Sequence, residues 1–170
     1  MPNTKPKLLR PIASVKWKGI TLPTYEEVCG HSEYPLRGEK TYNRVVREYM
    51  RDKWPMTIYR CIAVDDPTEI DTAQVGTSWT YNVESAEPYY GLYGPGRGIY
   101  VLIAQVNPQQ VDWIETIAMN MMPNDDECEI AVKRGEQLEI TGIMEYKESR
   151  MGENYEDEDI KPFHVKMVTV

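Results

Sequence analysis

The chain has 170 residues. This length predicts a single domain over residues 1–170, with enough chain to bury a core. Its 27 acidic and 19 basic residues give a net charge of −8, so nucleic acid is not expected as the primary partner. No apolar run reaches the roughly 18 residues that cross a bilayer, and no signal peptide is recognisable at the start. We therefore expect a cytoplasmic protein with no membrane partner.

Cysteine and histidine are sparse and poorly spaced for metal binding. The three cysteines, at positions 29, 61 and 128, show no Cys-x-x-Cys spacing, and the two histidines lie far apart at positions 31 and 164. An odd number of cysteines in a chain of this length favours free thiols in a reducing compartment. We expect neither a metal site nor a disulfide framework.

The first part of the chain predicts an irregular arm followed by helices. Residues 1–22 contain three prolines, which interrupt helices, although residues 20–22 fit a short strand. Thr24 fits the N-cap of a short helical turn over residues 24–28. Residues 39–53 predict a helix, because their apolar side chains recur at the i, i+3, i+4, i+7 spacing that places them on one face, and a proline follows two residues later.

After this helix the periodicity changes to that of strands. Residues 56–64 and 75–80 predict strands, residues 83–90 predict a short helix, and residues 98–106 predict an almost wholly apolar strand that is central and buried on both faces. The Gly- and Pro-rich residues 91–98 precede a strand. A phosphate-binding glycine loop follows one, so this segment indicates a plain turn.

The last third of the chain continues this mixture of helix and strand. The predicted elements are a helix (109–120), two strands (129–132 and 137–146) joined by a hairpin turn (133–136), an acidic exposed loop (147–161) and a closing strand (162–170). Helices and strands that do not alternate regularly are typical of the α+β class. The sequence therefore predicts an α+β domain.

Two short motifs place polar side chains within predicted strands. Arg60 follows Tyr59 inside an apolar strand, where a cation needs an ion pair or a cleft to face. Ser78 and Thr80 flank Trp79, and on a strand both hydroxyl groups lie on one face. Taken alone, the Arg60 pattern is better explained by a salt bridge at a sheet edge, and the Ser78 and Thr80 pattern by ordinary strand polarity.

A third motif is a pair of carboxylates at the start of a predicted strand. Glu127 and Glu129 flank Cys128, and both side chains share one face if the strand extends that far back. Two carboxylates this close are expected to separate in pKa. A solvated acidic turn is the simpler interpretation, since Asp125 and Asp126 come directly before.

In this chain order, a strand Arg, a Ser-x-Thr and a Glu-x-Glu resemble the arginine–serine–glutamate class of mono-ADP-ribosyltransferases. The stretch ECEIAVKRGEQLEITGI at 127–143 is similar to the acidic motif of that family with its following strands. The resemblance covers roughly residues 40–146, and it looks most like the phage-encoded branch. It departs from the family pattern at Trp79, where a small residue is usual, and at Thr80, where Ser is commoner.

The resemblance implies an ADP-ribosyltransferase-like fold, in which two mainly antiparallel sheets form an NAD-binding cleft with flanking helices. It implies that the protein transfers ADP-ribose from NAD⁺ to an acceptor protein, on arginine, and releases nicotinamide. NAD⁺ is then a substrate and no metal takes part. If the chain is phage-encoded, the expected location is the host cytoplasm.

The resemblance also implies roles for individual residues. Glu129 matches the catalytic glutamate, Glu127 the residue that orients an acceptor arginine, and Ser78 the hydroxyl that fixes the catalytic glutamate. The residues expected to bind NAD⁺ are Arg60, Tyr59, Ser78, Trp79 and Thr80. The residues expected to bind the acceptor are Asn124, Asp125 and Asp126, in a predicted loop at 121–126 whose acidity suits a basic, arginine-bearing surface.

Two other functions remain open from the sequence. An NAD⁺ glycohydrolase, with water as the acceptor, needs the same three core side chains. A small α+β binding or structural module, in which the motifs are coincidence, predicts that NAD⁺ does not bind at all.

Overall fold

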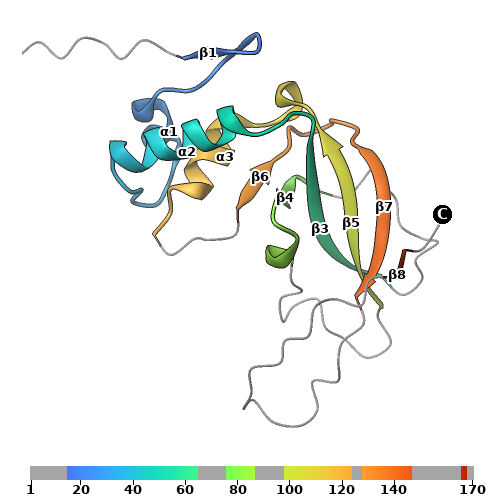
Figure 1. Ribbon diagram of the computed structural model, residues 1–170. Helices are drawn as coiled ribbons and strands as arrows, with labels where there is room; N and C mark the ends of the chain where they lie inside the picture. Colours follow the sequence, from blue (N-terminus) through green and yellow to red (C-terminus); the bar gives the residue numbers. More distant parts are fainter. Residues whose placement is uncertain (1–14, 65–75, 87–97, 124–127, 147–165, 168–170) are drawn as a thin grey trace, which may run out of the picture.

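The computed structural model describes residues 15–64, 76–86, 98–123, 128–146 and 166–167. Within these residues the chain forms three α-helices and two antiparallel sheets (Figure 1). Neighbouring strands pair antiparallel, and the helices gather beside one part of the larger sheet instead of alternating with its strands. This arrangement confirms the predicted α+β class.

The larger sheet has six strands in the order β6-β4-β3-β5-β7-β8. The strands are β3 (Met56–Val64), β4 (Ser78–Thr80), β5 (Gly98–Val106), β6 (Glu129–Ala131), β7 (Glu139–Tyr146) and β8 (Lys166–Met167). The predicted strands at 56–64 and 98–106 are confirmed with these bounds. Of the predicted closing strand, the described part is β8.

Strand β5 is the centre of this sheet. It pairs with β3 along nine residues, from Met56↔Val106 to Val64↔Gly98, and with β7 on its other side. Six of its nine residues are buried, because apolar side chains cover both of its faces. The prediction of a central strand buried on both sides is therefore confirmed.

Strands β4 and β6 form a short extension of the sheet. The extension joins β3 through one residue pair, Tyr59↔Thr80, and β6 then pairs with β4 from Ser78↔Ala131 to Thr80↔Glu129. In Figure 1, β4 and β6 lie beside the helices, while β3, β5 and β7 run together as a long curved unit. The sheet thus has two parts, β4 with β6 and the longer strands with β8, which are joined by the single pair Tyr59↔Thr80.

The predicted hairpin at residues 133–136 is wrong in one respect. A turn is present there, closed by the hydrogen bond from the Glu136 amide to the Lys133 carbonyl at 3.3 Å. The strands on either side do not pair with each other, because β6 pairs with β4 and β7 pairs with β5. The turn therefore begins a connection across the sheet, with β4, β3 and β5 between its two strands.

The predicted irregular arm also needs correction, because its last residues form a hairpin. Strands β1 (Lys16–Trp17) and β2 (Ile20–Thr21) pair antiparallel around Lys18 and Gly19, whose φ angles are 48° and 77°. Two successive positive φ angles belong to the type I′ turn, which matches the twist of paired strands. Residues 1–14 lie outside the described part of the chain.

The three helices are α1 (Tyr25–His31), α2 (Glu39–Arg51) and α3 (Trp113–Asn120). Thr24 caps α1 as predicted, in a capping box with Glu27, and the helix extends beyond the expected single turn. α3 begins later than predicted, because a 3₁₀ turn comes first and the Asp112 side chain accepts the hydrogen bond that starts the helix. In place of the predicted short helix at 83–90, the structure has a 3₁₀ turn, Val83–Ser85; residues 87–90 are not described.

The main core lies between the helices and one face of the sheet. The buried side of α2 carries Tyr42, Val45, Val46 and Tyr49, as its periodicity predicts, and the fully buried Ile58 belongs to the same cluster. Burial of large apolar side chains of this kind supplies most of the favourable free energy of folding.

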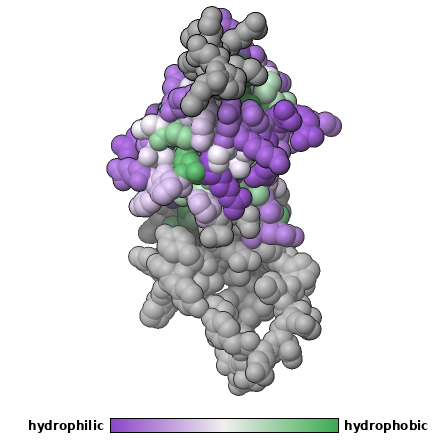
Figure 2. Space-filling view, turned by 90° about the vertical axis from the view of Figure 1, so that its left-hand side faces the viewer, coloured by the Kyte–Doolittle hydropathy of each residue, from purple (hydrophilic) through white to green (hydrophobic). Residues whose placement is uncertain are grey.

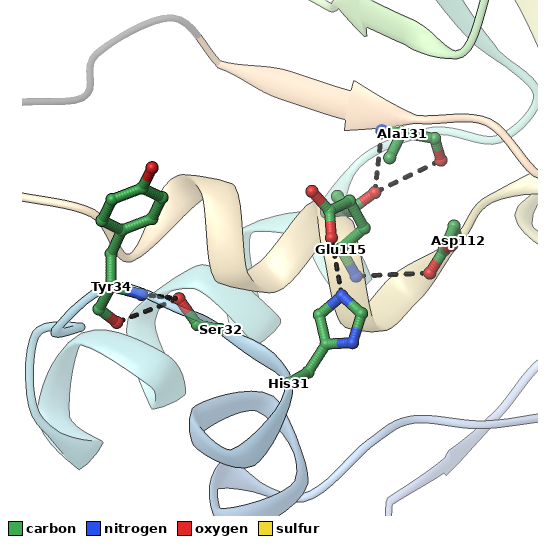
Figure 3. A network of polar contacts seen from close by, with 7 residues as sticks. His31, Ser32, Tyr34, Asp112, Glu115 and Ala131 are labelled. Carbon is green, nitrogen blue, oxygen red and sulfur yellow. Dashed lines mark hydrogen bonds and ion pairs between the residues drawn. The ribbon is translucent and has the colours of Figure 1, made fainter.

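Polar contacts fix α3 between α1 and β6. His31 Nε2 lies 2.7 Å from the Glu115 carboxylate, which links α1 to α3 (Figure 3). The Thr116 hydroxyl accepts from the Ala131 amide at 2.9 Å and so links α3 to β6. The surface over this helical side of the molecule is mainly hydrophilic, with small apolar patches (Figure 2). In the described residues, no helix has the length and apolar character that crossing a membrane requires.

Alkaline pH is expected to destabilise this fold through Tyr49. Burial raises the pKa of the Tyr49 phenol well above its usual value, and burial also raises that of Tyr81. Above about pH 10 the unfolded chain loses these protons while the folded chain keeps them, so the free energy of unfolding falls as the pH rises. Tyr49 alone contributes a slope of up to about 1.4 kcal/mol per pH unit in this range.

Urea unfolding at pH 8, 10 and 11 measures this slope. The Tyr49→Phe variant, which has no proton to lose at this position, is expected to show a shallower decline than the wild type. Equal declines in the two proteins would contradict the assignment of the slope to Tyr49.

Candidate active site

Ser78 and Glu129 lie on one face of the β4–β6 pair. Glu129 stands opposite Thr80, and Ser78 is one step along the same face, because side chains two residues apart on a strand point the same way. The Ser78 hydroxyl donates to Glu129 Oε1 at 3.2 Å. Glu129 is 8% exposed, so little water reaches its side chain. The Ser78 hydroxyl favours one orientation of the carboxylate in this nearly dry setting.

Arg60 reaches the same place from strand β3. Its Nη1 donates to the backbone carbonyl oxygen of Ser78. Arg60 and Tyr59 point to opposite sides of β3, and β4 leaves β3 after the Tyr59↔Thr80 pair. The guanidinium therefore extends to β4 just beyond the point at which the two strands separate.

Gly76 makes room for the Arg60 guanidinium. A Cβ atom built on Gly76 would lie 2.8 Å from Arg60 Nη2, and the φ angle of Gly76 is 81°. Only glycine adopts this conformation without strain while leaving the space beside the backbone empty. The sequence analysis did not single out Gly76 as a site residue. Its signal in the sequence is a glycine two residues before the short strand β4.

Trp79 and Tyr59, both predicted to bind NAD⁺, lie on opposite faces of the sheet. Trp79 is 2% exposed and lies in the main core, where its indole N–H donates to the Gly76 carbonyl at 3.1 Å. Tyr59 packs against the separate cluster of Ala86, Val101 and Met144 on the other face of the sheet. Alternation along β4 places Trp79 on the face opposite Ser78, whereas Tyr59 is paired with Thr80 and so lies on the same face of the sheet as Ser78 and Glu129.

Thr80 also has a structural position. It is 6% exposed, and its hydroxyl lies 3.2 Å from the carbonyl oxygen of Cys128. Cys128 has a φ angle of 52°, which is uncommon for a residue other than glycine. Thr80 thus contacts the backbone at the entrance to β6, where the chain turns sharply into the strand.

This turn changes the expectation for the two carboxylates. Strand β6 begins at Glu129, and the positive φ of Cys128 ends the strand alternation there. The described part of β6 therefore does not extend back to the position of Glu127. Glu127 itself lies outside the described residues, as do Asn124, Asp125 and Asp126.

Two helical residues that the sequence analysis missed hold the backbone of Glu129. The Tyr49 hydroxyl donates to the Glu129 carbonyl at 2.6 Å, and Asn120 Nδ2 lies 2.8 Å from the same oxygen. Asn120 Nδ2 is also 2.8 Å from the Tyr49 hydroxyl oxygen. Burial raises the pKa of the Tyr49 phenol, so the phenol remains a donor well into the alkaline range. Helices α2 and α3 together fix the position of β6 at its first residue.

The group therefore consists of an anion, a hydroxyl and a cation from three strands. A fixed carboxylate stabilises positive charge that develops nearby, and a planar guanidinium binds phosphate or hydroxyl oxygens. Two hollows in the described residues, of about 450 and 410 Å³, are lined by other side chains. In the described residues, no cluster of three or more His, Cys, Asp or Glu side chains is arranged to hold a metal ion.

Comparison of the chain with models of known families, with curated proteins and with solved structures gives no match. A function for this chain must therefore be argued from its own residues and their geometry.

Replacement of Gly76 tests the packing around Arg60. Gly76→Ala adds a methyl group where the guanidinium lies and strains the backbone, whereas Gly135→Ala, at a φ of 83° with open space around it, adds only the strain. We expect Gly135→Ala to cost about 1 kcal/mol of unfolding free energy. Gly76→Ala should cost at least about 1 kcal/mol more, because the guanidinium must leave the Ser78 carbonyl.

Urea unfolding of the two variants gives the comparison. Equal losses of stability would contradict the close packing of Arg60 on Gly76.

Proposed function

We propose that the protein is a mono-ADP-ribosyltransferase of the arginine–serine–glutamate class, which transfers ADP-ribose from NAD⁺ to an arginine of an acceptor protein. One observation carries the proposal: Arg60, Ser78 and Glu129, on three different strands, lie together, with Ser78 bonded to the Glu129 carboxylate. The sequence alone placed these residues far apart, in separate motifs. Coincidental motifs have no reason to converge in this way.

The chemistry that this group suits is cleavage of a glycosidic bond to a good leaving group. The bond between the ribose C1′ and the nicotinamide nitrogen breaks, nicotinamide departs with the bonding electrons, and positive charge develops on the ribose. The Glu129 carboxylate stabilises this charge and accepts a hydrogen bond from a ribose hydroxyl. Its low exposure strengthens the interaction, because little water screens it.

Ser78 and Arg60 orient the reacting groups in this proposal. The Ser78 hydroxyl holds the carboxylate in one orientation before NAD⁺ arrives, which lowers the cost of organising the site during the reaction. Arg60 binds phosphate or ribose oxygens of NAD⁺ through its planar guanidinium group, which suits paired hydrogen bonds to such oxygens. Trp79, Thr80 and Tyr59 act in this proposal through packing and backbone contacts.

The acceptor step completes the proposed reaction. A guanidinium nitrogen of the acceptor arginine attacks C1′, and Glu127 takes the proton that this nitrogen loses. The carboxylates of Asp125 and Asp126, with the amide of Asn124, bind the basic surface around that arginine. Membership of the phage-encoded branch, and with it a location in the host cytoplasm, belongs to the same proposal.

The family fold is also part of the proposal, and the divided sheet supports it. The ADP-ribosyltransferase fold places NAD⁺ in a cleft between two mainly antiparallel sheets. Here β4 and β6 leave the long strands after one residue pair, and the three site residues lie at this division. A ligand at the division contacts both parts of the sheet at once.

Replacement of Glu129 tests the proposed chemistry. Glu129→Gln keeps the shape of the side chain and removes its charge, so transfer of labelled ADP-ribose from NAD⁺ to protein should fall by about 100-fold or more. Glu136→Gln, in the exposed turn before β7, removes one charge elsewhere and should leave the rate unchanged. Full transfer activity in purified Glu129→Gln would overturn the assignment.

The position of the label distinguishes the alternatives. ADP-ribose that appears free in solution, with none on protein or on an arginine analogue, indicates a glycohydrolase and contradicts the transferase. A calorimetric titration that detects no binding of NAD⁺ to the wild type indicates a non-enzymatic module and contradicts both enzymes.

The Tyr49 hydroxyl is predicted to act as a positioning group for Glu129. Tyr49→Phe removes the donor to the Glu129 carbonyl, and Tyr42→Phe removes a comparable bond to the Pro23 carbonyl, far along the same helix. Each variant should lose about 1 kcal/mol of stability. Only Tyr49→Phe should lower kcat, by about 3- to 10-fold with little change in KM, because the carboxylate is less well placed in the transition state. Equal kcat values for the two variants would contradict this role.

A further inference from the structure

Helix α2 has a basic surface on the side away from the core. A hollow of about 410 Å³ lies along it, lined by Lys40, Thr41, Asn43, Arg44, Arg47 and Arg51. Every lining side chain can donate a hydrogen bond, and none carries a carboxylate or is purely apolar. The chain as a whole has eight more acidic than basic residues, so this local excess of cations is opposite in sign to the composition.

The four cations form one stripe along the helix. At about 100° per residue, Lys40, Arg44, Arg47 and Arg51 fall within an arc of about 60°, and at 1.5 Å per residue they span about 16 Å. All four are exposed. We call these four residues the basic stripe.

The helix holds the basic stripe in a fixed arrangement. The opposite side of α2 is anchored in the core, with Val45 and Tyr49 nearly inaccessible to solvent. Arg44 forms an ion pair with Glu48 at 3.2 Å, and Glu48 stands at the margin of the stripe, one turn along the helix. This exposed pair restrains one nitrogen of Arg44 and is worth little energetically, so the stripe keeps its net positive charge.

We infer that the basic stripe binds the phosphate backbone of a nucleic acid strand. Its four cations repeat along a line of about 16 Å, a length over which the backbone of a nucleic acid strand presents several successive phosphates. Arginine forks bind phosphate oxygens in pairs, and Thr and Asn side chains are common additional donors to them. An acidic peptide offers a poorer match, because successive side chains of an extended peptide point to opposite sides.

The net charge of −8 limits this binding without preventing it. At physiological ionic strength charges more than about 8 Å apart are largely screened, so a bound strand responds mainly to the stripe itself. The expected affinity is that of sequence-independent binding, in the micromolar range and strongly dependent on salt. The inference therefore concerns a second contact, separate from the proposed protein acceptor.

The binding of fluorescent 20-nucleotide RNA, single-stranded DNA and duplex DNA, followed by anisotropy at several NaCl concentrations, tests the inference. Four phosphate contacts predict a slope of log Kobs against log salt of about −2.8 for single strands and about −3.6 for a duplex. Arg47→Gln/Arg51→Gln should halve this slope and lower the affinity at 50 mM NaCl by at least about 10-fold. Glutamine keeps the helical propensity, and circular dichroism checks the fold.

A matched variant controls for total charge. Lys133→Gln/Arg134→Gln removes two exposed cations from the turn before β7 and should bind like the wild type. Equal weakening in both double variants, no detectable binding by the wild type, or tighter binding of poly-glutamate than of any oligonucleotide would overturn the inference. NAD⁺ titration is independent of this outcome, since neither variant alters Arg60, Ser78 or Glu129.

Discussion

The three-residue strand β4 determines how the parts of this molecule meet. Thr80 pairs with Tyr59 of β3 on one side and with Glu129 of β6 on the other. The position of Arg60 relative to Glu129 therefore depends on a strand too short to be stable alone. Trp79 compensates, because its indole is buried in the main core and bonds to the Gly76 carbonyl. Anchoring of the middle residue directs Ser78 and Thr80 to the opposite face.

The candidate site contains two features that are uncommon in folded proteins. A half-buried cation is placed against a glycine with positive φ, and Cys128 adopts a conformation unusual for its type at the start of β6. Each feature costs stability in isolation. Hydrogen bonds from Tyr49 and Asn120 to the carbonyl of Glu129 hold this strained entrance in place. Stability from the helices thus offsets strain near the Glu129 carboxylate.

Local patterns predicted the elements, and non-local pairing decided the site. Apolar spacing predicted α2, and the capping residue Thr24 predicted α1, since both depend on neighbours within a few residues. The turn at 133–136 looked like a hairpin because the sequence cannot show that β6 pairs with β4. Tyr49 and Asn120 carried no motif, since their partner is a backbone carbonyl distant in sequence. Arg60, Ser78 and Glu129 were accessible only through the order of three motifs.

Helix α2 contributes one side to the proposed active site and the other side to the proposed nucleic acid surface. The 3.6-residue repeat of the helix places Val45 and Tyr49 on its buried side, and the same repeat places the four cations of the basic stripe on its exposed side. The buried side sets the backbone of Glu129, so the helix cannot shift without disturbing the carboxylate. A nucleic acid strand bound at the basic stripe therefore leaves the Glu129 carboxylate in place only if α2 does not move. A net charge of −8 is then compatible with a cationic surface, because fixed local geometry, and not the total charge, presents the four cations together.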